Sequence, residues 1–174
     1  MGILYKIYNK DIRFFDLKFV LKARLQGKDN FKPFFRCIKI EDEKIIGTDS
    51  RRMHIITIKD HGFQPGIYEI LVNQKNEIIM HESSDGFTWP KWELIIPKDY
   101  KKRNTTKYTD DISGPIQLFR ILPEQIGIKF YYLQDLDRYN SWTVYIPKAL
   151  EPVIFESDKK MAVIMPFKVK ETAN

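Results

Sequence analysis

The chain has 174 residues, of which 43% are hydrophobic and 14% aromatic; this supports one ordinary domain or two very small ones and excludes disorder for most of the chain. Its 29 Lys and Arg against 23 Asp and Glu give a net charge of +6, which permits a polyanionic partner without requiring one. Cys37 is the single cysteine, and the three histidines are too scattered for a zinc site, so we expect no internal disulfide, metal or cofactor. No apolar run is long enough to span a membrane and residues 1–10 carry no secretory signal, so we expect a cytoplasmic protein without a membrane partner.

Short segments rich in β-branched and aromatic residues, mostly separated by Gly, Pro, Asn or Asp, are typical of strands. In the first half the predicted strands are Ile3–Tyr8, Asp11–Phe15, Phe34–Glu41, Lys44–Thr48, Met53–Lys59, Ile67–Val72 and Glu77–Glu82. In the second half they are Ile116–Leu122, Gln125–Ile128, Trp142–Ile146, Val153–Glu156 and Met161–Val169. The turns at residues 41–43 and 157–160 suit hairpins.

Two segments have helical periodicity. Leu17–Gln26 follows Asp16, a good N-cap, precedes Gly27, a good C-cap, and places Leu17, Leu21 and Leu25 on one stripe. Lys129–Arg138 is the second, with Tyr132, Leu133 and Leu136 at helical spacing.

Each predicted helix follows a short strand and precedes a run of strands, so the chain reads as two similar halves without a sequence repeat. The class is α+β: two pseudo-repeated halves of antiparallel strands with one helix each, in a single domain over residues 1–174. Half one covers about residues 1–97 and half two about 112–170. Between them, residues 98–111 are polar, basic and without apolar periodicity, which predicts a surface loop or insertion.

The sequence contains none of the common catalytic motifs: no glycine-rich phosphate loop, nucleophile elbow or metal-binding helix. Cys37 lies in an apolar segment and is expected to be a buried structural thiol. Asp49 with Arg51 and Arg52 permits phosphate chemistry by an enzyme, but an Asx turn in which Asp49 binds backbone amides is the more frequent arrangement. We therefore expect a protein that is not an enzyme.

Two basic clusters are candidates for binding nucleic acid, and for each the alternative is a solvated surface. The first is on the predicted helix and consists of Lys18, Lys22 and Arg24. The second is in the loop, interleaved with two tyrosines, and consists of Lys101, Lys102, Arg103 and Lys107. A further aromatic stretch contains Trp89 and Trp92, which fit either a peptide groove or core packing equally well.

Several stretches together resemble the bacterial sliding clamp, the beta subunit of DNA polymerase III. FFRCIKIEDEKIIGTDSRRMHIITI (Phe34–Ile58) is similar to the clamp hairpin that ends in ATDGHRL, and TWPKWELIIP (Thr88–Pro97) is similar to FPDYxxVIP. IGIKFYYLQDL (Ile126–Leu136) and PVIFESDKKMAVIMPFKV (Pro152–Val169) resemble the helix carrying YLLD and the closing hairpin with VMPMRL. The matches follow the family's order.

The sequence also departs from the family. The family chain has three clamp domains, whereas this chain has room for one; Ser50 and Arg51 replace the Gly and His of the signature. What the resemblance implies is a clamp-like domain with antiparallel sheets outside and two helices on the inner face. In the family these helices offer Lys and Arg to duplex phosphates without reading bases, which makes Lys18, Lys22 and Arg24 the matching residues here.

The resemblance also implies a hydrophobic pocket for peptides of polymerases and clamp loaders, which in the family lies between successive domains. The matching positions are Thr48, Arg52, Met53, Pro97, Ile164, Met165, Pro166 and Phe167. By analogy the protein is a DNA polymerase processivity factor that forms a homo-oligomeric ring, with six copies for the family's six domains. The alternative is a monomeric interaction module, of phage or mobile-element type, that binds clamp-interacting proteins without encircling DNA.

Overall fold

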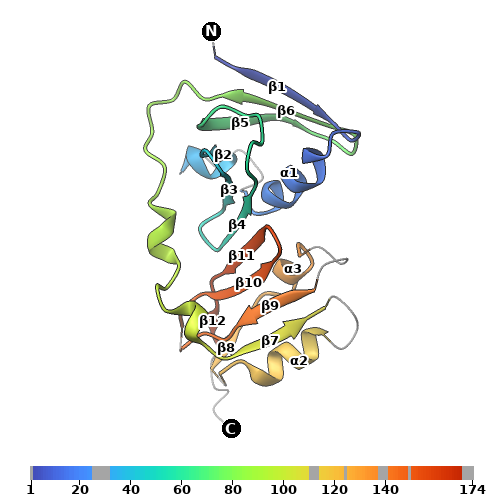
Figure 1. Ribbon diagram of the computed structural model, residues 1–174. Helices are drawn as coiled ribbons and strands as arrows, with labels where there is room; N and C mark the ends of the chain where they lie inside the picture. Colours follow the sequence, from blue (N-terminus) through green and yellow to red (C-terminus); the bar gives the residue numbers. More distant parts are fainter. Residues whose placement is uncertain are drawn as a thin grey trace. The chain divides into compact units, whose positions relative to one another are not determined.

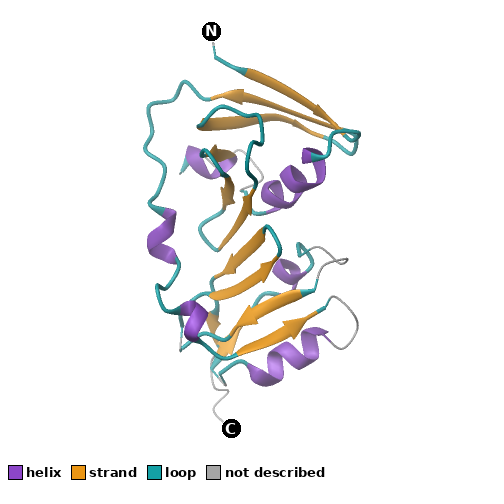
Figure 2. Cartoon of the chain, viewed as in Figure 1, coloured by secondary structure: helices purple, strands orange, loops and turns teal. Residues whose placement is uncertain are grey.

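A computed structural model describes residues 2–24, 32–109, 114–123, 125–136, 141–148 and 150–169. The chain forms two compact units, residues 1–90 (unit 1) and residues 91–174 (unit 2). Both units contain more strand than helix, as Figure 2 shows. The predicted α+β class is confirmed.

Unit 1 is built on an antiparallel sheet with the strand order β1-β6-β5-β2-β3-β4 (Figure 1). The strands are β1 (Leu4–Tyr8), β2 (Cys37–Ile40), β3 (Lys44–Thr48), β4 (Arg52–Thr57), β5 (Gly66–Asn73) and β6 (Glu77–Glu82). The hairpin β3–β4 pairs Ile45 with Ile56 and Gly47 with His54. Six of the seven strands predicted for this half are confirmed, because each has the apolar pattern of a strand and a turn at its ends.

Helix α1 (Arg13–Lys22) packs against β3 and β4. It begins four residues before the predicted start, so the predicted strand Asp11–Phe15 is wrong. Asp11 causes the early start, because its Oδ1 accepts a hydrogen bond from the backbone N–H of Arg13 at 2.9 Å. Asp16, the predicted N-cap, is instead buried within the helix, whereas Leu17 and Leu21 are buried as predicted. Leu25 and Gly27 lie outside the described residues.

Unit 2 has its own antiparallel strands in the order β11-β10-β9-β7, and β12 pairs separately with β8. The strands are β7 (Thr105–Tyr108), β8 (Ile126–Gly127), β9 (Trp142–Tyr145), β10 (Val153–Ser157), β11 (Lys160–Ile164) and β12 (Phe167–Lys168). The predicted turn at residues 157–160 joins β10 to β11, and Asp158 at its tip has a φ of 40°. Met161–Val169, predicted as one strand, is divided by Met165 and Pro166 into β11 and β12.

One strand predicted for the second half is a helix in the structure. Ile116–Leu122, predicted as a strand, lies mostly in helix α2 (Gly114–Ile121), so unit 2 has one helix more than expected. Its Leu118 and Leu122 lie four residues apart and are both buried, whereas Ile116 is exposed; this is the spacing of a helix face. The helix predicted over Lys129–Arg138 corresponds to α3 (Phe130–Leu133). Tyr132, Leu133 and Leu136 are buried, as their helical spacing predicts.

Residues 98–109, the described part of the segment 98–111 that was predicted as a surface loop or insertion, contain regular structure; residues 110 and 111 lie outside the described residues. Tyr100–Lys102 forms a 3₁₀ turn, and β7 pairs with β9, with Tyr108 opposite Trp142. Short 3₁₀ turns also occur at Pro33–Arg36 (η1) and Trp92–Ile95 (η2). Strand β7 lies at the edge of its sheet, where polar Thr and Lys side chains are tolerated. It therefore lacks the apolar pattern by which a strand is predicted from sequence.

Each unit has its own buried apolar side chains. Those of unit 1 include Ile38, Ile46, Ile56 and Tyr68, and those of unit 2 include Trp142, Val144, Ile154 and Phe155. Within the described residues, no helix is long and apolar enough to cross a membrane.

Candidate functional site

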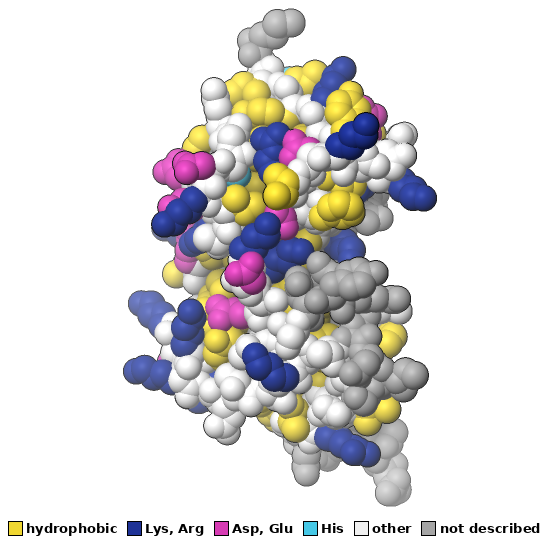
Figure 3. Space-filling model, turned by 45° about the vertical axis from the view of Figure 1, so that its right-hand side comes forward, with side chains coloured by type: hydrophobic (Ala, Val, Ile, Leu, Met, Phe, Trp, Pro, Cys, Tyr) yellow, Lys and Arg dark blue, Asp and Glu magenta, His cyan; other side chains and the backbone are white. Residues whose placement is uncertain are grey.

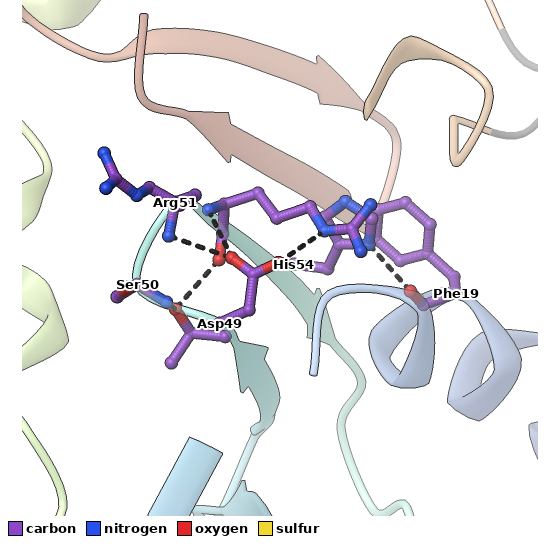
Figure 4. Close-up of polar contacts among 7 residues, drawn as sticks. Phe19, Asp49, Ser50, Arg51 and His54 are labelled. Carbon is purple, nitrogen blue, oxygen red and sulfur yellow. Dashed lines mark hydrogen bonds and ion pairs between the residues drawn. The ribbon is translucent and has the colours of Figure 1, made fainter. Parts of the chain in front are cut away.

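The turn between β3 and β4 is the part of unit 1 that carries the signature-like residues (Figure 4). The Asp49 Oδ1 atom accepts hydrogen bonds from the backbone N–H groups of Arg51 and Arg52, each at 2.9 Å. The Asp49 Oδ2 atom lies 3.1 Å from Nε of Arg52. Thr48 completes the turn, because its hydroxyl donates to the carbonyl of Arg52 at 2.8 Å and accepts from the N–H of Ser50 at 3.2 Å.

These contacts decide between the two interpretations of Asp49. Both carboxylate oxygens are engaged within the turn, and Ser50 has a φ of 73°, a left-handed conformation that the surrounding bonds stabilise. The Asx-turn interpretation is confirmed. Among the described residues, no cluster of three or more His, Cys, Asp or Glu side chains is arranged to hold a metal ion.

His54 lies behind this turn, where β4 meets α1. Its side chain is fully buried; Nδ1 lies 2.7 Å from the carbonyl oxygen of Phe19, and its ring stacks on the Phe19 ring at 4.3 Å. Burial lowers the pKa of His54 to about 3, with Arg52 and Lys22 as lesser causes. The neutral imidazole therefore donates from Nδ1 and joins the helix to the sheet.

The three basic residues predicted on the first helix have different surroundings. Lys18 Nζ donates at 2.5 Å both to Oδ1 of Asn73 and to the carbonyl of Gln74, and burial lowers its pKa. Lys22 is exposed in the last turn of α1. Arg24 is half-buried and donates from Nη1 to the carbonyl of Arg36 at 3.1 Å. Only part of the predicted basic cluster therefore forms one exposed helix face.

The second basic cluster is also divided. Lys101 and Lys102 are exposed, and Lys107 is exposed with its Nζ 2.9 Å from Oγ1 of Thr143. Arg103 differs from the prediction: its side chain is 2% exposed and lies 2.7 Å from Glu151. Arg103 thus belongs to the interior of unit 2. On the face drawn in Figure 3, Lys and Arg side chains are interspersed with hydrophobic and acidic ones.

A hollow of about 550 Å³ lies in unit 1 beside the turn from β1 to α1. This hollow was not predicted, because its lining residues come from two segments that are far apart in the sequence, residues 6–11 and Asn76. Its lining combines amines, amides, a phenol and a carboxylate, from Lys6, Tyr8, Asn9, Lys10, Asp11 and Asn76. Arg13 binds the Asp11 carboxylate and holds the pKa of Asp11 below its usual value, so this acid stays ionised. Lys6 and Lys10 add two positive charges near α1.

The predicted peptide-pocket residues fall in both units. In unit 1, Thr48 and Met53 are buried, and Arg52 is half-buried and bound to Asp49. The buried thioether of Met53 is part of the core. That these residues form part of a peptide-binding surface stays a prediction.

In unit 2 four of the predicted pocket residues, Ile164, Met165, Pro166 and Phe167, lie at the break between β11 and β12. Ile164 is fully buried, whereas Met165 is 36% and Phe167 46% exposed. Pro97 and Pro166 are half-buried. Of the predicted pocket residues, Met165 and Phe167, directly after β11, are therefore the exposed ones.

Trp89 and Trp92 are each 5% exposed, which favours core packing over a peptide groove. In unit 1, Trp89 packs edge-on against Phe34, with ring centroids 6.2 Å apart. The most exposed apolar residue of this stretch is Leu94, at 77%, followed by Ile95, at 38%. Sequence reasoning missed it because alternation within a 3₁₀ turn does not follow the strand or the helix period.

A hydrogen-bonded cluster in unit 2 was also missed. Tyr100 donates to Oε1 of Glu156 at 2.5 Å, and Tyr145 donates to Oε2 at 2.8 Å. Burial and these bonds raise the pKa of both tyrosines. The cluster fixes the 3₁₀ turn that carries Lys101 and Lys102 to the sheet. No sequence signal could have paired residues 56 positions apart.

No protein-family model and no curated protein matches this sequence. Solved structures of sliding clamps do match its fold. The Helicobacter pylori beta clamp bound to a DNA ligase peptide has a TM-score of 0.61 at 10% identity, covering 97% of this chain and 67% of the other. The beta chain of DNA polymerase III from Streptococcus pneumoniae has a TM-score of 0.60 at 12% identity, covering 97% of this chain and 66% of the other. The Bartonella birtlesii clamp bound to griselimycin gives 0.55 at 12%, covering 95% and 66%.

The resemblance to the sliding clamps is therefore confirmed at the level of the fold. The likeness extends over nearly the whole chain, which spans about two thirds of the length of these clamps. At this identity the fold is what the comparison shows.

Proposed function

We propose that this protein is a sliding-clamp-like processivity factor: not an enzyme, but a homo-oligomeric ring that binds duplex DNA irrespective of sequence. The observation that carries the proposal is the clamp fold over 97% of the chain. A net charge of +6 and the exposed Lys22 on α1 support contact with phosphates.

The exposure and the bonded partners of each basic side chain decide which residues we propose as DNA contacts. Lys18, Lys22, Lys101, Lys102 and Lys107 are the proposed contacts, because their ammonium groups lie on or close to the surface. The half-buried Arg24 stays a proposed contact beside them. Lys6 and Lys10 join them, as they line the hollow beside the turn from β1 to α1. Arg103 is left out because Glu151 already binds its guanidinium.

Duplex binding tests this proposal. Fluorescence anisotropy with labelled duplexes of unrelated sequence should give similar affinities that fall steeply as the salt concentration rises from about 50 to 200 mM. Absence of binding at low salt would remove DNA from the function. A strong preference for one sequence would contradict binding through phosphates alone.

We also propose that the surface after β11 binds short peptides of polymerases and clamp loaders. Met165 and Phe167 are exposed and adaptable in shape. The DNA ligase peptide bound by the Helicobacter pylori clamp is a suitable probe. Met165→Asp and Phe167→Asp should abolish its binding in calorimetry, with the exposed Leu150→Asp as the control for a general effect of charge.

A monomeric interaction module is the second candidate. Arg103 lies in the interior of unit 2, which weakens the second basic cluster, while the apolar side chains after β11 stay exposed. This function predicts peptide binding by a monomer that does not associate with DNA. Peptide affinity unchanged in Met165→Asp and Phe167→Asp would remove the pocket from both candidates.

A further inference from the structure

The hollow beside the turn from β1 to α1 is built by two segments that are bonded to each other. One is the end of β1 with the residues that follow it, and the other is the turn between β5 and β6. Asn9 joins them, because its backbone N–H donates to the carbonyl of Asn76 at 3.1 Å and its side-chain amide donates to Oδ1 of Asn76 at 3.2 Å. The volume of about 550 Å³ lies in the range of binding pockets and suits a short segment of chain.

Two amines that line the hollow have no counterion. Lys6 and Lys10 are exposed, and within the described part of the chain neither forms an ion pair. The carboxylate of Asp11 also lines the hollow, but Arg13 binds it, with Nε 2.8 Å from Oδ1. This ion pair compensates the charge of Asp11, so the two lysines leave the hollow positive and favour an acidic group there.

An apolar surface begins directly after the hollow. Ile12 is 86% and Phe15 68% exposed, and their spacing of three residues places them on one face at the start of α1. The ring of Phe15 meets the buried ring of Phe14 edge-on, with centroids 5.6 Å apart, which holds it in place. Tyr8, which lines the hollow itself, is 53% exposed. Large apolar side chains grouped on a surface in this way favour a partner that covers them.

The combination of groups favours a peptide over a strand of DNA. A carboxylate has about four lone-pair sites, and Arg13 donates to Asp11 from its backbone N–H, Nε and Nη2, which leaves a site open. The sugar–phosphate backbone of DNA offers acceptors only, whereas a peptide offers a backbone N–H to that site and an acidic side chain to the lysines. Apolar side chains of a peptide also cover Ile12 and Phe15, which phosphates cannot do.

We propose that the hollow and the adjoining start of α1 bind a short acidic and apolar segment of a partner protein. An Asp or Glu side chain of the segment pairs with Lys6 and Lys10, and a large apolar side chain packs on Ile12 and Phe15. This site lies in unit 1, whereas the surface after β11 lies in unit 2. The inference goes beyond the proposed function, since the segment binds without DNA and without a ring. Because Lys6 and Lys10 are also proposed duplex contacts, a bound segment takes these two contacts from the duplex.

Peptide display supplies the probe for this site. A random peptide library is selected against the complete chain, and a representative of each enriched family is labelled for fluorescence anisotropy. We expect one family to combine Asp or Glu with Leu, Ile, Phe or Trp. Its peptide should bind about tenfold more weakly to Phe15→Ser, and equally so to Lys6→Gln with Lys10→Gln, because each variant removes one part of the site. Met165→Asp should leave its affinity unchanged.

Matched controls separate the site from general effects of charge and exposure. Leu150→Ser removes another apolar side chain, 51% exposed, and Lys59→Gln with Lys91→Gln removes the same charge from exposed positions. Both should keep the affinity for the peptide within about twofold. A peptide with Gln in place of its acids should bind the unmodified protein about tenfold more weakly, a result that does not depend on the folding of any variant. Thermal unfolding monitors the fold of every variant.

Two outcomes overturn the inference. The first is a selection in which no acidic and apolar family loses affinity in Phe15→Ser and in the double lysine variant. The second is single-stranded or duplex DNA that loses affinity in Phe15→Ser while the affinity for the peptide is unchanged, which would assign this surface to nucleic acid. Both outcomes leave the proposed function standing, because that function fails only if the unmodified protein does not bind duplex DNA at low salt.

Discussion

Asp49 stabilises unit 1 through the backbone of its own turn. Its carboxylate accepts hydrogen bonds from the N–H groups of Arg51 and Arg52, so Asp49→Ala leaves two donors without their acceptor. We expect the free energy of unfolding to fall by about 1–2 kcal/mol, measured by urea denaturation. Asp49→Asn keeps one oxygen acceptor and should recover part of the stability. Equal stability of Asp49→Ala and the unmodified protein would contradict this role.

His54 makes the stability depend on acidity. Burial lowers its pKa from 6.5 in the unfolded chain to about 3 in the folded protein, so between these pH values the unfolded chain binds the proton. The contribution of His54 to the free energy of unfolding is therefore fully present above pH 6.5. Between pH 6.5 and about pH 3 it falls by about 1.4 kcal/mol for each pH unit.

Urea denaturation at several pH values tests this effect. His54→Gln, although less stable at neutral pH, should lose stability less steeply than the unmodified protein between about pH 6 and pH 4. His81→Gln, at a half-buried position in β6, is the control for the loss of an imidazole. Parallel pH dependences in His54→Gln and the unmodified protein would show that His54 is not buried in neutral form.

Lys22 and Lys18 should differ in their contribution to DNA binding. Lys22 is exposed, whereas Lys18 is half-buried and its ammonium donates to Asn73 and to the carbonyl of Gln74. Lys22→Gln should lower the salt slope of duplex binding by about one, and Lys18→Gln by less. Fluorescence anisotropy across a salt series distinguishes the two variants, and a larger effect of Lys18→Gln would reverse the assignment.

At the residue scale, contacts between residues close in the sequence were predictable, and contacts between distant residues were not. The Asx turn at Asp49 was predictable because its partners lie two and three positions away. The burial of Arg103 was not, because Glu151 is distant in the sequence and the basic segment around Arg103 has the composition of a solvated loop. Likewise, nothing near Arg24 in the sequence indicates its contact with Arg36.

The packing of α1 on the hairpin β3–β4 depends on a glycine. A Cβ at Gly47 would lie 2.5 Å from the carbonyl oxygen of Val20 and 2.9 Å from its Cγ1, so the helix would have to move. Gly47→Ala should therefore lower the free energy of unfolding by about 1–3 kcal/mol in urea denaturation. Gly86→Ala is the control, since a Cβ there meets nothing within 4 Å. Equal effects of the two substitutions would contradict close packing.

At the element scale, the strands of the hairpins were predictable and the helix boundaries less so. Apolar alternation bounded by turn residues predicts β3, β4 and β10 because both signals are local. In α2, Ile116, Leu118 and Leu122 fit alternation equally well, and only the burial of Leu118 and Leu122 identifies a helix. Edge strand β7 escaped prediction because polar residues are tolerated there.

At the scale of the whole molecule, a few short motifs were enough to predict a clamp-like fold that sequence comparison with families does not detect. The fold is retained at 8–12% identity because many apolar sequences can fill the same core positions. The charged side chains are less constrained by the fold, so the proposed DNA and peptide binding rest on this chain's own Lys22, Met165 and Phe167.

Ring formation is the central claim, and the mass in solution tests it most directly. Light scattering across a concentration series, at two salt concentrations, should show one stable closed oligomer, of six copies by analogy with the family's six domains. Such a species should keep its mass on dilution, since a closed ring has no free ends. A chain that stays monomeric at every concentration and both salt concentrations would contradict a self-assembled ring and favour the monomeric peptide-binding module.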